Sequence, residues 1–316
     1  MGAVISNERH AIAVEPDSRP AMLEAMRDAV VAAGGTVVPV DEASALMWAD
    51  PAAADAFPGV VADAPELEWV QLPYAGIENF ADQLDQSKTW TCGKGVYAEP
   101  VAEHVITLTL AGFRHLHTSI PATSWPAQEG RNLLGATVTV VGAGGITESL
   151  VRLLQPWNVS IRVIRRSEEP FPGVERTVAL ADTTAVHEVI GDADVVVLAA
   201  ALTEETRHLV DASFLGAMGS KAWLVNVARG GLVDHGALGE ALRSGEIAGA
   251  ALDVTTPEPL PEDHELWALS NCIITPHVGN TPEMGLPLIA ERVRHNVQRW
   301  IAGEALIGLV DVHAGY

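Results

Sequence analysis

Three residues with complementary chemistry, Arg229, Glu258 and His277, each follow a short apolar run in the C-terminal half of the sequence. A histidine paired with a carboxylate is held in one orientation and keeps its proton near neutrality, so it can deliver that proton. An arginine clamps a carboxylate with two parallel hydrogen bonds and polarises an adjacent carbonyl. Together these residue types could bind a carboxylate-bearing carbonyl compound and protonate its oxygen.

The runs that precede these residues are rich in apolar side chains without alternation, which is typical of strands buried on both faces of a parallel sheet. The runs are Trp223–Val227, Ala248–Val254 and Cys272–Thr275. Ligands collect at the carboxyl ends of parallel strands, so we expect the three side chains to meet at one sheet edge. Taken singly, Arg229 could cap a strand end, Glu258 could be a solvated acid, and His277 could be a packed histidine.

A glycine-rich turn joins the expected strand Thr137–Val141 to the expected helix Ile146–Leu154. Gly142 permits a tight turn, and Gly144 lets the backbone approach a pyrophosphate at the helix N-terminus. The turn lies within a strand–helix–strand unit and therefore predicts a dinucleotide site, the alternative being an ordinary tight turn. Thr147 occupies the position of the usual third glycine, so we expect the helix to lie slightly farther from the sheet.

The next expected strand, Ser160–Ile164, ends in Arg165, Arg166 and Ser167. An NAD site places an acid at this strand end to bind the ribose 2′-hydroxyl. Two arginines and a serine instead suit a 2′-phosphate, because guanidinium binds phosphate in a bidentate manner. The sequence therefore predicts a preference for NADP(H), with NAD(H) also possible. The alternative is a pair of solvated arginines countered by the glutamates that follow.

Strands that alternate with helices predict two α/β regions, the second of them a doubly wound parallel sheet. In the first region we expect strands at Ala11–Val14, Val37–Val40, Ala45–Trp48 and Leu67–Leu72, and a helix at Pro20–Ala33. In the second region we also expect a strand at Val195–Ala199 and a helix at His235–Ser244. A helix over Pro100–Thr118 is apolar nearly all round and is expected to be buried within a domain or between subunits. A last helix spans Pro282–Ala302 and ends at Gly303.

Composition excludes several classes of protein. The chain has 316 residues, of which 48% are hydrophobic, and a net charge of −22 from 41 acidic and 19 basic residues. Such a charge disfavours nucleic acid and anionic membranes as partners, and no apolar run is long enough for a membrane helix. Acidity could reflect a solubilising surface or adaptation to high salt. The two distant cysteines and the absence of a secretory signal pattern favour a cytoplasmic protein.

Other histidines are weaker candidates for a site. His115 and His117 could suggest a metal, but residues two apart on a helix face different directions, so we expect no metal site. His104, in the long apolar helix, is expected to serve packing or a subunit interface.

Four motifs together resemble those of the D-isomer-specific 2-hydroxyacid dehydrogenases. They are NVARGGLVD (226–234), ALDVTTPEPLP (251–261), TPHVGNT (275–281) and VAEHVITLTLA (101–111). The resemblance covers essentially the whole chain. It implies two Rossmann-like, doubly wound parallel-sheet domains with a cleft between them, and an intertwined homodimer. The substrate domain would comprise residues 1–100 and about 283–316, and the dinucleotide-binding domain residues 101–282.

The resemblance also implies residue roles. Arg229 would bind the substrate carboxylate and carbonyl, His277 would be the general acid/base, and Glu258 would pair with it. Cofactor contacts would come from the glycine turn, the basic strand end and the site edge: Gly142, Gly144, Gly145, Ile146, Arg165, Arg166, Ser167, Val227, Ala228, Arg229, Asp253 and His277. The loop that includes Tyr74, Ala75 and Gly76 would hold the substrate carboxylate through backbone N–H groups.

Within the family, the Arg-Arg-Ser strand end is similar to that of NADPH-dependent glyoxylate/hydroxypyruvate reductases. Formate dehydrogenases carry glutamine where Glu258 stands, and the long phosphoglycerate dehydrogenases carry a regulatory domain for which no residues remain here. We therefore expect reduction of a small 2-keto acid to the D-2-hydroxy acid. The alternative is a nucleotide-sensing scaffold like the C-terminal-binding corepressors. It is disfavoured because those proteins usually add partner-binding extensions, whereas this chain ends soon after its last expected helix.

Overall fold

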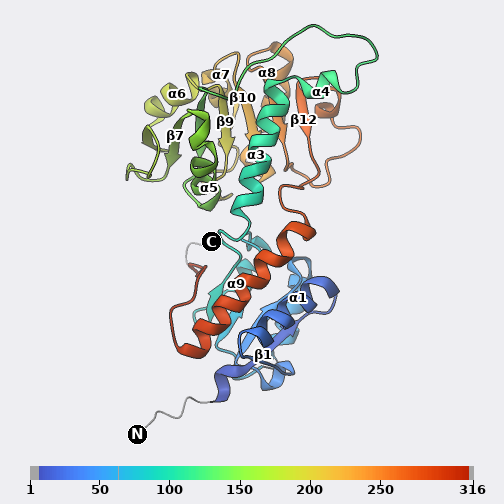
Figure 1. Cartoon of the computed structure of the whole chain (residues 1–316), viewed down its shortest axis with the longest axis vertical. Helices are drawn as coiled ribbons and strands as arrows, with labels where there is room; N and C mark the ends of the chain where they lie inside the picture. The colour runs from blue at the N-terminus through green and yellow to red at the C-terminus, as the bar shows by residue number, and fades with distance from the viewer. Residues whose placement is uncertain (1–6, 63, 313–316) are drawn as a thin grey trace. The chain divides into compact units, whose positions relative to one another are not determined.

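The computed structural model describes residues 7–62 and 64–312, which form two compact α/β units. One unit comprises the described chain up to Tyr97 and from Thr281 onward, and the other is Ala98–Asn280. Each unit is built on its own parallel sheet (Figure 1). The two parallel-sheet units confirm the expected fold class.

The first unit has a five-stranded parallel sheet in the order β2-β1-β3-β4-β5. Its strands are β1 (Ala11–Glu15), β2 (Thr36–Val37), β3 (Ala45–Trp48), β4 (Trp69–Gln71) and β5 (Thr89–Thr91). The expected strand Val37–Val40 was wrong beyond its first residue, because the chain turns at Pro39 into a short 3₁₀ segment. β5, which is only three residues long, was not predicted from the sequence.

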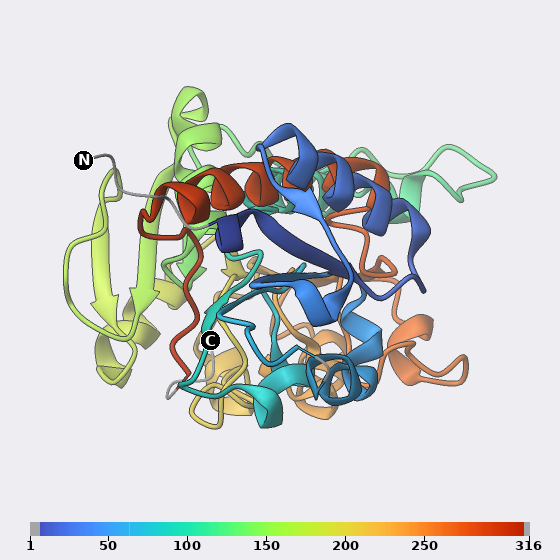
Figure 2. The same ribbon diagram turned by 90° about the horizontal axis from the view of Figure 1, so that it is seen from below.

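Helices cover both faces of this sheet. They are α1 (Pro20–Ala32), α2 (Phe57–Ala62) and α9 (Pro282–Ala302), with 3₁₀ segments at Asn7–His10, Val40–Glu42, Pro51–Ala56 and Glu78–Gln83. α1 and α9 lie side by side (Figures 1 and 2), and Trp300 of α9 packs on Trp69 of β4 with ring centroids 5.5 Å apart. On the other face, Trp48, Phe57 and Phe80 form an aromatic cluster with edge-on ring contacts. The loops after β1 and β4 are thereby mounted on a rigid sheet.

The second unit has a seven-stranded parallel sheet in the order β12-β11-β10-β9-β6-β7-β8. Its strands are β6 (Thr137–Val141), β7 (Ser160–Arg165), β8 (Arg176–Ala179), β9 (Val195–Leu198), β10 (Trp223–Asn226), β11 (Gly249–Leu252) and β12 (Cys272–Ile274). The chain order reverses between β6 and β9, which are neighbours in the sheet. Such a switch point is where open α/β sheets bind ligands.

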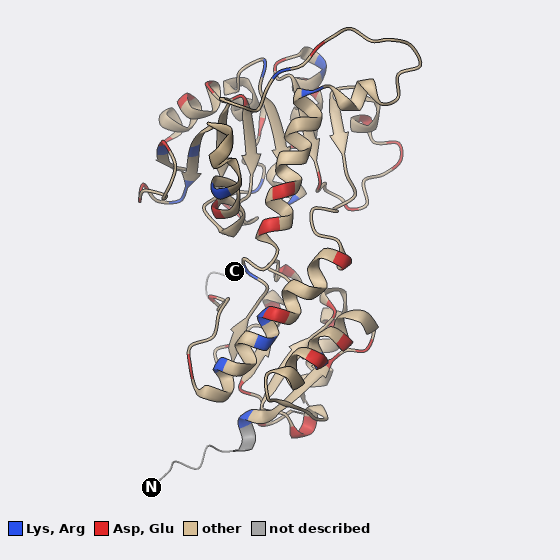
Figure 3. Cartoon of the chain, viewed as in Figure 1, with Lys and Arg blue, Asp and Glu red and all other residues tan. Residues whose placement is uncertain are grey.

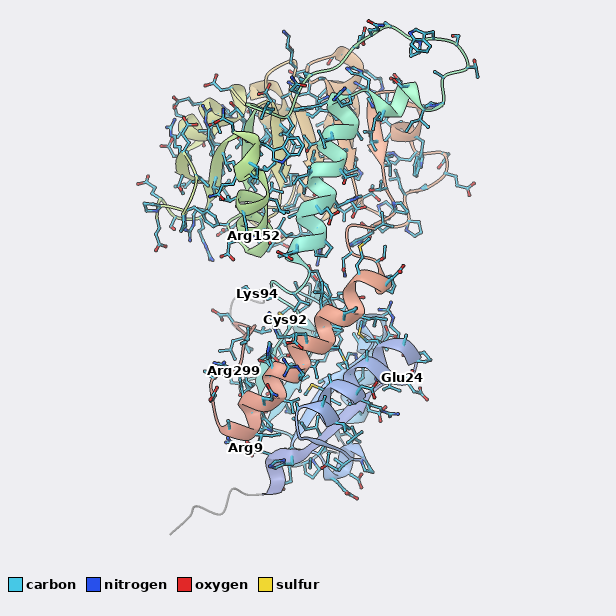
Figure 4. All side chains as sticks on the ribbon, in the orientation of Figure 1. Arg9, Glu24, Cys92, Lys94, Arg152 and Arg299 are labelled. Atoms are coloured by element: carbon cyan, nitrogen blue, oxygen red, sulfur yellow. The ribbon has the colours of Figure 1, made fainter. Side chains whose placement is uncertain are left out.

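The helices of the second unit are α3 (Ala98–Phe113), α4 (Leu116–Ser119), α5 (Gly145–Leu154), α6 (Thr183–Gly191), α7 (Ala212–Ala217) and α8 (His235–Ser244). Short 3₁₀ segments follow at Gln155–Trp157, Gly230–Leu232 and Glu265–Ala268. α3 packs against α5, and Arg152 of α5, labelled in Figure 4, pairs with Glu99 in the first turn of α3.

The expectation of one helix over Pro100–Thr118 was wrong at its C-terminal end. The helix ends at Phe113, and His115 adopts a left-handed backbone with φ of 51° before α4 begins. In the last turn of the helix, Gly112 lies against the ring of Trp223, where an added Cβ would come within 2.6 Å. Only a residue without a side chain fits between the helix and this indole.

Acidic side chains outnumber basic ones along the ribbons of both units (Figure 3). Among the described residues, no helix is long and apolar enough to cross a membrane. Some of the acidic residues are exposed partners in ion pairs, as in Arg176–Glu188 and Arg243–Glu240.

Candidate active site

The glycine turn between β6 and α5 has the backbone that a dinucleotide site requires. Gly142 has a φ of +120°, and a Cβ built there would lie 2.4 Å from the carbonyl oxygen of Ala199. Any side chain at this position would therefore clash with the end of β9, and only glycine fits. The N–H of Gly142 donates to the Ile164 carbonyl of β7 at 2.8 Å, which fixes the turn at the switch point.

The N-terminus of α5 is open on its outer side. Gly144 precedes the helix in an extended conformation, and a Cβ built on it would meet no atom within 4 Å. Within the described part of the chain, the N–H groups of Gly144, Gly145 and Ile146 have no acceptor. Unpaired N–H groups at a helix N-terminus attract negative charge. The turn therefore fits the pyrophosphate of a dinucleotide.

Thr147 stands at the position of the usual third glycine of this turn. Its side chain is fully buried, and its hydroxyl donates to the carbonyl oxygen of Gly142 at 2.9 Å. The threonine thus ties the first turn of α5 back to the glycine turn.

The basic strand end of β7 lies beside an acidic residue. The guanidinium of Arg165 is 3.6 Å from the carboxylate of Glu169 and donates to the Glu169 backbone carbonyl at 3.2 Å. Arg166 and Ser167 follow directly and are exposed. Glu169 therefore offsets part of the positive charge that a 2′-phosphate would meet here.

Glu258 and His277, which follow β11 and β12, meet as the sequence predicts. Nδ1 of His277 lies 2.9 Å from Oε2 of Glu258, and Oε1 of Glu258 accepts a hydrogen bond from the N–H of Thr255 at 2.9 Å. The carboxylate is thus fixed from both ends and orients the imidazole. Because Nδ1 is engaged, Nε2 is the nitrogen that remains to exchange a proton with a bound molecule. The side chain of His277 is 55% exposed, so a ligand can reach it.

His277 is held by Asp253. From the sequence, Asp253 was expected only to contact the cofactor. The N–H of His277 donates to the backbone carbonyl of Asp253 at 2.9 Å, and His277 has a left-handed φ of 53°. The Asp253 carboxylate accepts hydrogen bonds from the N–H groups of Val278 and Gly279, both at 2.9 Å. Two loops at the ends of β11 and β12 are therefore fastened together around the histidine.

His104 completes this network from α3. Its Nε2 lies 3.2 Å from both Oδ1 of Asp253 and the hydroxyl of Thr275, and Thr275 donates to the same Asp253 oxygen at 2.5 Å. His104 was expected to serve packing or a subunit interface, and within this unit it forms a part-buried polar contact. The histidine of the motif VAEHVITLTLA was the one signal in the sequence. Its partner Thr275 lies 171 residues later in the chain, so the contact could not be predicted.

The buried Asp253 gives the site a predicted acid sensitivity. Burial alone would raise its pKa, but hydrogen bonds from His104, Thr275, Val278 and Gly279 outweigh burial and lower the pKa from 3.8 to about 2. A carboxyl with a lowered pKa in the folded state stabilises the fold above its unfolded pKa, and this contribution disappears as the pH falls through about 2. We expect Asp253→Asn to lose on the order of 2 kcal/mol of unfolding free energy at pH 7.

The measurement is urea unfolding of the wild type and of Asp253→Asn between pH 7 and pH 2. The difference between them should shrink as the pH falls from about 4 toward 2. Asp28→Asn, on the exposed side of α1, is the matched control. A difference that is unchanged across this range would contradict the hydrogen-bonded arrangement.

The turn after β10 fixes the position of the Arg229 backbone. The buried side chain of Asn226 accepts from the N–H of Ala228 at 3.1 Å and donates to the carbonyl of Arg229 at 3.0 Å. Gly230 packs directly on the backbone of Thr255, where an added Cβ would lie 2.0 Å from the carbonyl. The Arg229 turn and the Glu258 loop are therefore locked together, and Asn226 is a positioning residue that the motif contained but the sequence analysis did not single out. Val227, like Ala228, is buried in the same turn.

The loop after β4, described within its own unit, is rigid and has free N–H groups. The N–H of Gly93 donates to the Tyr74 carbonyl at 3.0 Å, and the hydroxyl of Tyr97 donates to the Pro73 carbonyl at 2.7 Å. In the described chain, no acceptor faces the N–H groups of Tyr74, Ala75 and Gly76. Arg292 of α9 braces the neighbouring loop by donating to the carbonyls of Cys92 and Lys94, residues labelled in Figure 4. This loop can therefore bind an anion through its backbone.

His115 and His117 lie together, contrary to the reasoning from helical spacing. Their rings stack with centroids 5.8 Å apart, because α3 has already ended at Phe113. His117 also packs edge-on against Trp223. Over the residues that the structure describes, no group of three or more histidine, cysteine or acidic side chains is placed to hold a metal ion.

Known proteins are similar to this chain in sequence and in fold. Residues 105–279 match the model of the D-isomer specific 2-hydroxyacid dehydrogenase NAD binding domain. The chain is 40% identical over 264 residues to an uncharacterized protein of the proB 3′ region of Corynebacterium melassecola, with 80% of this chain and 86% of that protein covered. It is 33% identical over 255 residues to the glyoxylate reductase/hydroxypyruvate reductase of Homo sapiens, with 77% and 74% covered.

Solved structures agree. The D-isomer specific 2-hydroxyacid dehydrogenase of Xanthobacter autotrophicus Py2, in complex with NADPH and MES, has a TM-score of 0.82 and 26% identity, covering 97% of this chain and 99% of that one. The fold and site define an NAD(P)-dependent oxidoreductase. The chain belongs to the D-isomer-specific 2-hydroxyacid dehydrogenase family.

Proposed function

We propose that this dehydrogenase reduces a small 2-keto acid, of the size of glyoxylate or hydroxypyruvate, to the D-2-hydroxy acid, with NADPH as the preferred cofactor. The observation that carries the proposal is the 2.9 Å pair between His277 and Glu258 at the end of neighbouring strands, beside the Arg229 turn. Glyoxylate reductase/hydroxypyruvate reductases of Homo sapiens and Mus musculus are 33% identical to this chain, which supports the substrate class.

Each proposed role follows from local geometry. Glu258 holds Nδ1 of His277, so Nε2 donates its proton to the carbonyl oxygen as that oxygen gains negative charge. Arg229 binds the substrate carboxylate and polarises the carbonyl. The reduced nicotinamide, when bound, supplies a hydride to the carbonyl carbon. In the reverse direction His277 takes the proton from the hydroxyl.

We assign cofactor binding to the glycine turn and to residues around it. The open helix N-terminus at Gly144, Gly145 and Ile146 would hold the pyrophosphate, with Gly142 permitting the turn. Val227, Ala228, Arg229, Asp253 and His277 would line the nicotinamide end. The unit Ala98–Asn280 would then be the dinucleotide-binding domain and the other unit the substrate domain. Its N–H groups at Tyr74, Ala75 and Gly76 would bind the substrate carboxylate.

The NADPH preference rests on Arg165, Arg166 and Ser167. A 2′-phosphate carries nearly two negative charges, and the chain's net charge of −22 would repel it unless a local basic cluster intervened. A family member of known structure, from Xanthobacter autotrophicus, holds NADPH. The pairing of Arg165 with Glu169 weakens the cluster without removing it.

Replacing Arg165 and Arg166 together by Asp and Gly should therefore lower kcat/KM for NADPH far more than for NADH. The expected loss with NADPH is roughly a hundredfold, because two charge-assisted contacts are removed. The effect should be strongest at low ionic strength. Initial rates with both cofactors measure it, and Arg176→Ala on β8 is the control. Equal efficiency of the two cofactors in the wild type would show that the arginines face solvent.

The proposed activity is tested by following NADPH absorbance with glyoxylate, hydroxypyruvate and phenylpyruvate. We expect turnover of the two smaller acids. No turnover with any 2-keto acid, together with retained NADPH binding, would overturn the proposal and favour a nucleotide-sensing scaffold.

We also propose a homodimer in the cytoplasm. The segment after α3 exposes the large apolar side chains of Ile120, Trp125 and Leu134, which are 61–90% exposed. Large apolar side chains exposed on one segment favour a subunit interface. Both cysteines are free thiols, which suits a reducing compartment. Light scattering coupled to size exclusion tests the dimer, and a mass near 33.4 kDa would contradict it.

A further inference from the structure

Arg19 occupies a position in the first unit that the proposed chemistry does not yet use. It follows β1 and directly precedes α1, and the loop that carries Tyr74 follows β4. β1, β3 and β4 are successive parallel neighbours, so both loops emerge at the same carboxyl edge of the sheet. Nη1 of Arg19 lies 3.4 Å from the hydroxyl of Tyr74, which joins the two loops.

The guanidinium of Arg19 has no acidic counterpart among the described residues. No carboxylate there lies within ion-pairing distance of it, although the chain has 41 acidic residues and most of its other arginines are paired. The nearby Asp50 is nearly buried and is already bound by the Ser18 hydroxyl at 2.7 Å and the Ala52 N–H at 3.0 Å. Arg19 is therefore a half-buried positive charge whose one polar side-chain contact in the described chain is a phenol.

The side chain of Tyr74, which contacts the Arg19 guanidinium, is held in place by Tyr97. Its ring packs on Tyr97 with centroids 5.3 Å apart, and Tyr97 is anchored through its hydroxyl to Pro73. Burial raises the pKa of Tyr97 well above its usual value, so that phenol stays neutral and serves as an anchor. The same short loop thus presents both the unpaired N–H groups of Tyr74 to Gly76 and a hydroxyl next to a guanidinium.

We propose that Arg19, together with the Tyr74 hydroxyl, recognises the group on the third carbon of the substrate. This inference rests on the proposed reduction of 2-keto acids. If the N–H groups of the loop hold the carboxylate, a further oxygen two carbons away comes within reach of a hydroxyl and a guanidinium on the same edge. A cation favours an oxygen-bearing substituent, above all an anionic one. The substrate class is then 2-keto acids with a hydroxyl or carboxylate on C3, in preference to those with an alkyl group.

The test compares substrates that differ only at that carbon. Glyoxylate has no third carbon and is the internal control; hydroxypyruvate bears a hydroxyl, oxaloacetate a carboxylate, and 2-ketobutyrate an alkyl group. Arg19→Met keeps the length of the side chain and removes the charge. We expect kcat/KM to fall roughly tenfold to a hundredfold with hydroxypyruvate and oxaloacetate, mainly through KM. The values for glyoxylate and 2-ketobutyrate should stay within about twofold of wild type.

Two further variants make the result specific. Arg27→Met, on an exposed position of α1, removes the same charge without touching Tyr74 and should leave all four substrates unchanged. Arg19→Lys should recover part of the oxaloacetate activity, because it restores the charge but not the planar fork. Equal losses with glyoxylate and oxaloacetate, or an unchanged ratio between them, would overturn the role of Arg19 while leaving the reductase activity standing. A wild type that reduces none of the four acids would overturn the proposed function and this inference with it.

Discussion

Replacing His277 by asparagine should lower kcat by roughly 10²–10⁴-fold and leave NADPH binding nearly intact, because proton transfer by a positioned side chain contributes about that much. Asparagine keeps the hydrogen bond to Glu258 but cannot give up a proton at the position of Nε2. The measurement is kcat with the best 2-keto acid, alongside the dissociation constant of NADPH from fluorescence titration.

A matched control is available in this chain. His295 and Glu291 form a second histidine–glutamate pair, 3.2 Å apart on the exposed face of α9. His295→Asn should change neither kcat nor NADPH binding, and Glu258→Gln should lose less activity than His277→Asn because the histidine itself remains. A His277→Asn enzyme within tenfold of wild type would remove His277 from proton transfer.

Arg229→Ala is the second change with a large expected effect. Loss of a charge-assisted, bidentate pair with the substrate carboxylate should cost several kcal/mol of transition-state binding, on the order of a thousandfold in kcat/KM. Both KM and kcat should be affected, since the guanidinium also polarises the carbonyl. Arg229→Lys should recover only part of the loss, because a lysine lacks the planar fork.

The control for Arg229 is Arg207→Ala, which removes a surface arginine paired with Glu204 in the same unit. The Arg229 guanidinium also donates to the Ala228 carbonyl at 2.8 Å, within the turn that the Asn226 side chain holds. Thermal unfolding of each variant therefore separates a catalytic loss from a folding defect. A loss of less than tenfold in a folded Arg229→Ala enzyme would place the carboxylate clamp elsewhere.

Local chemistry in the sequence was sufficient to predict the parallel sheets and the glycine turn. The run Thr137–Val141 is β-branched throughout and buried from Val138 onward, and the strand begins and ends at those residues. By contrast, β8 at Arg176–Ala179 is a short edge strand with an exposed arginine, so its sequence carries no buried-strand pattern. β5 also lacks a recognisable strand pattern, because it is formed by only three residues.

The pairing of Glu258 with His277 could be expected because both follow neighbouring strands of one sheet. The network around Asp253 could not, because it depends on His104 from a helix 149 residues earlier in the chain and on backbone N–H groups whose direction no sequence pattern specifies. Thr147 is similar: its hydroxyl replaces an absent glycine by bonding to Gly142, a contact that only the folded turn reveals.

The most direct test of the proposed reaction uses NADPH carrying deuterium at both C4 positions, with hydroxypyruvate as substrate. We expect D-glycerate with one deuterium on C2, detected by mass spectrometry and chiral chromatography, and the loss of this product in His277→Asn. A product without deuterium, an L-configured or racemic product, or an unchanged yield in the His277 variant would contradict it.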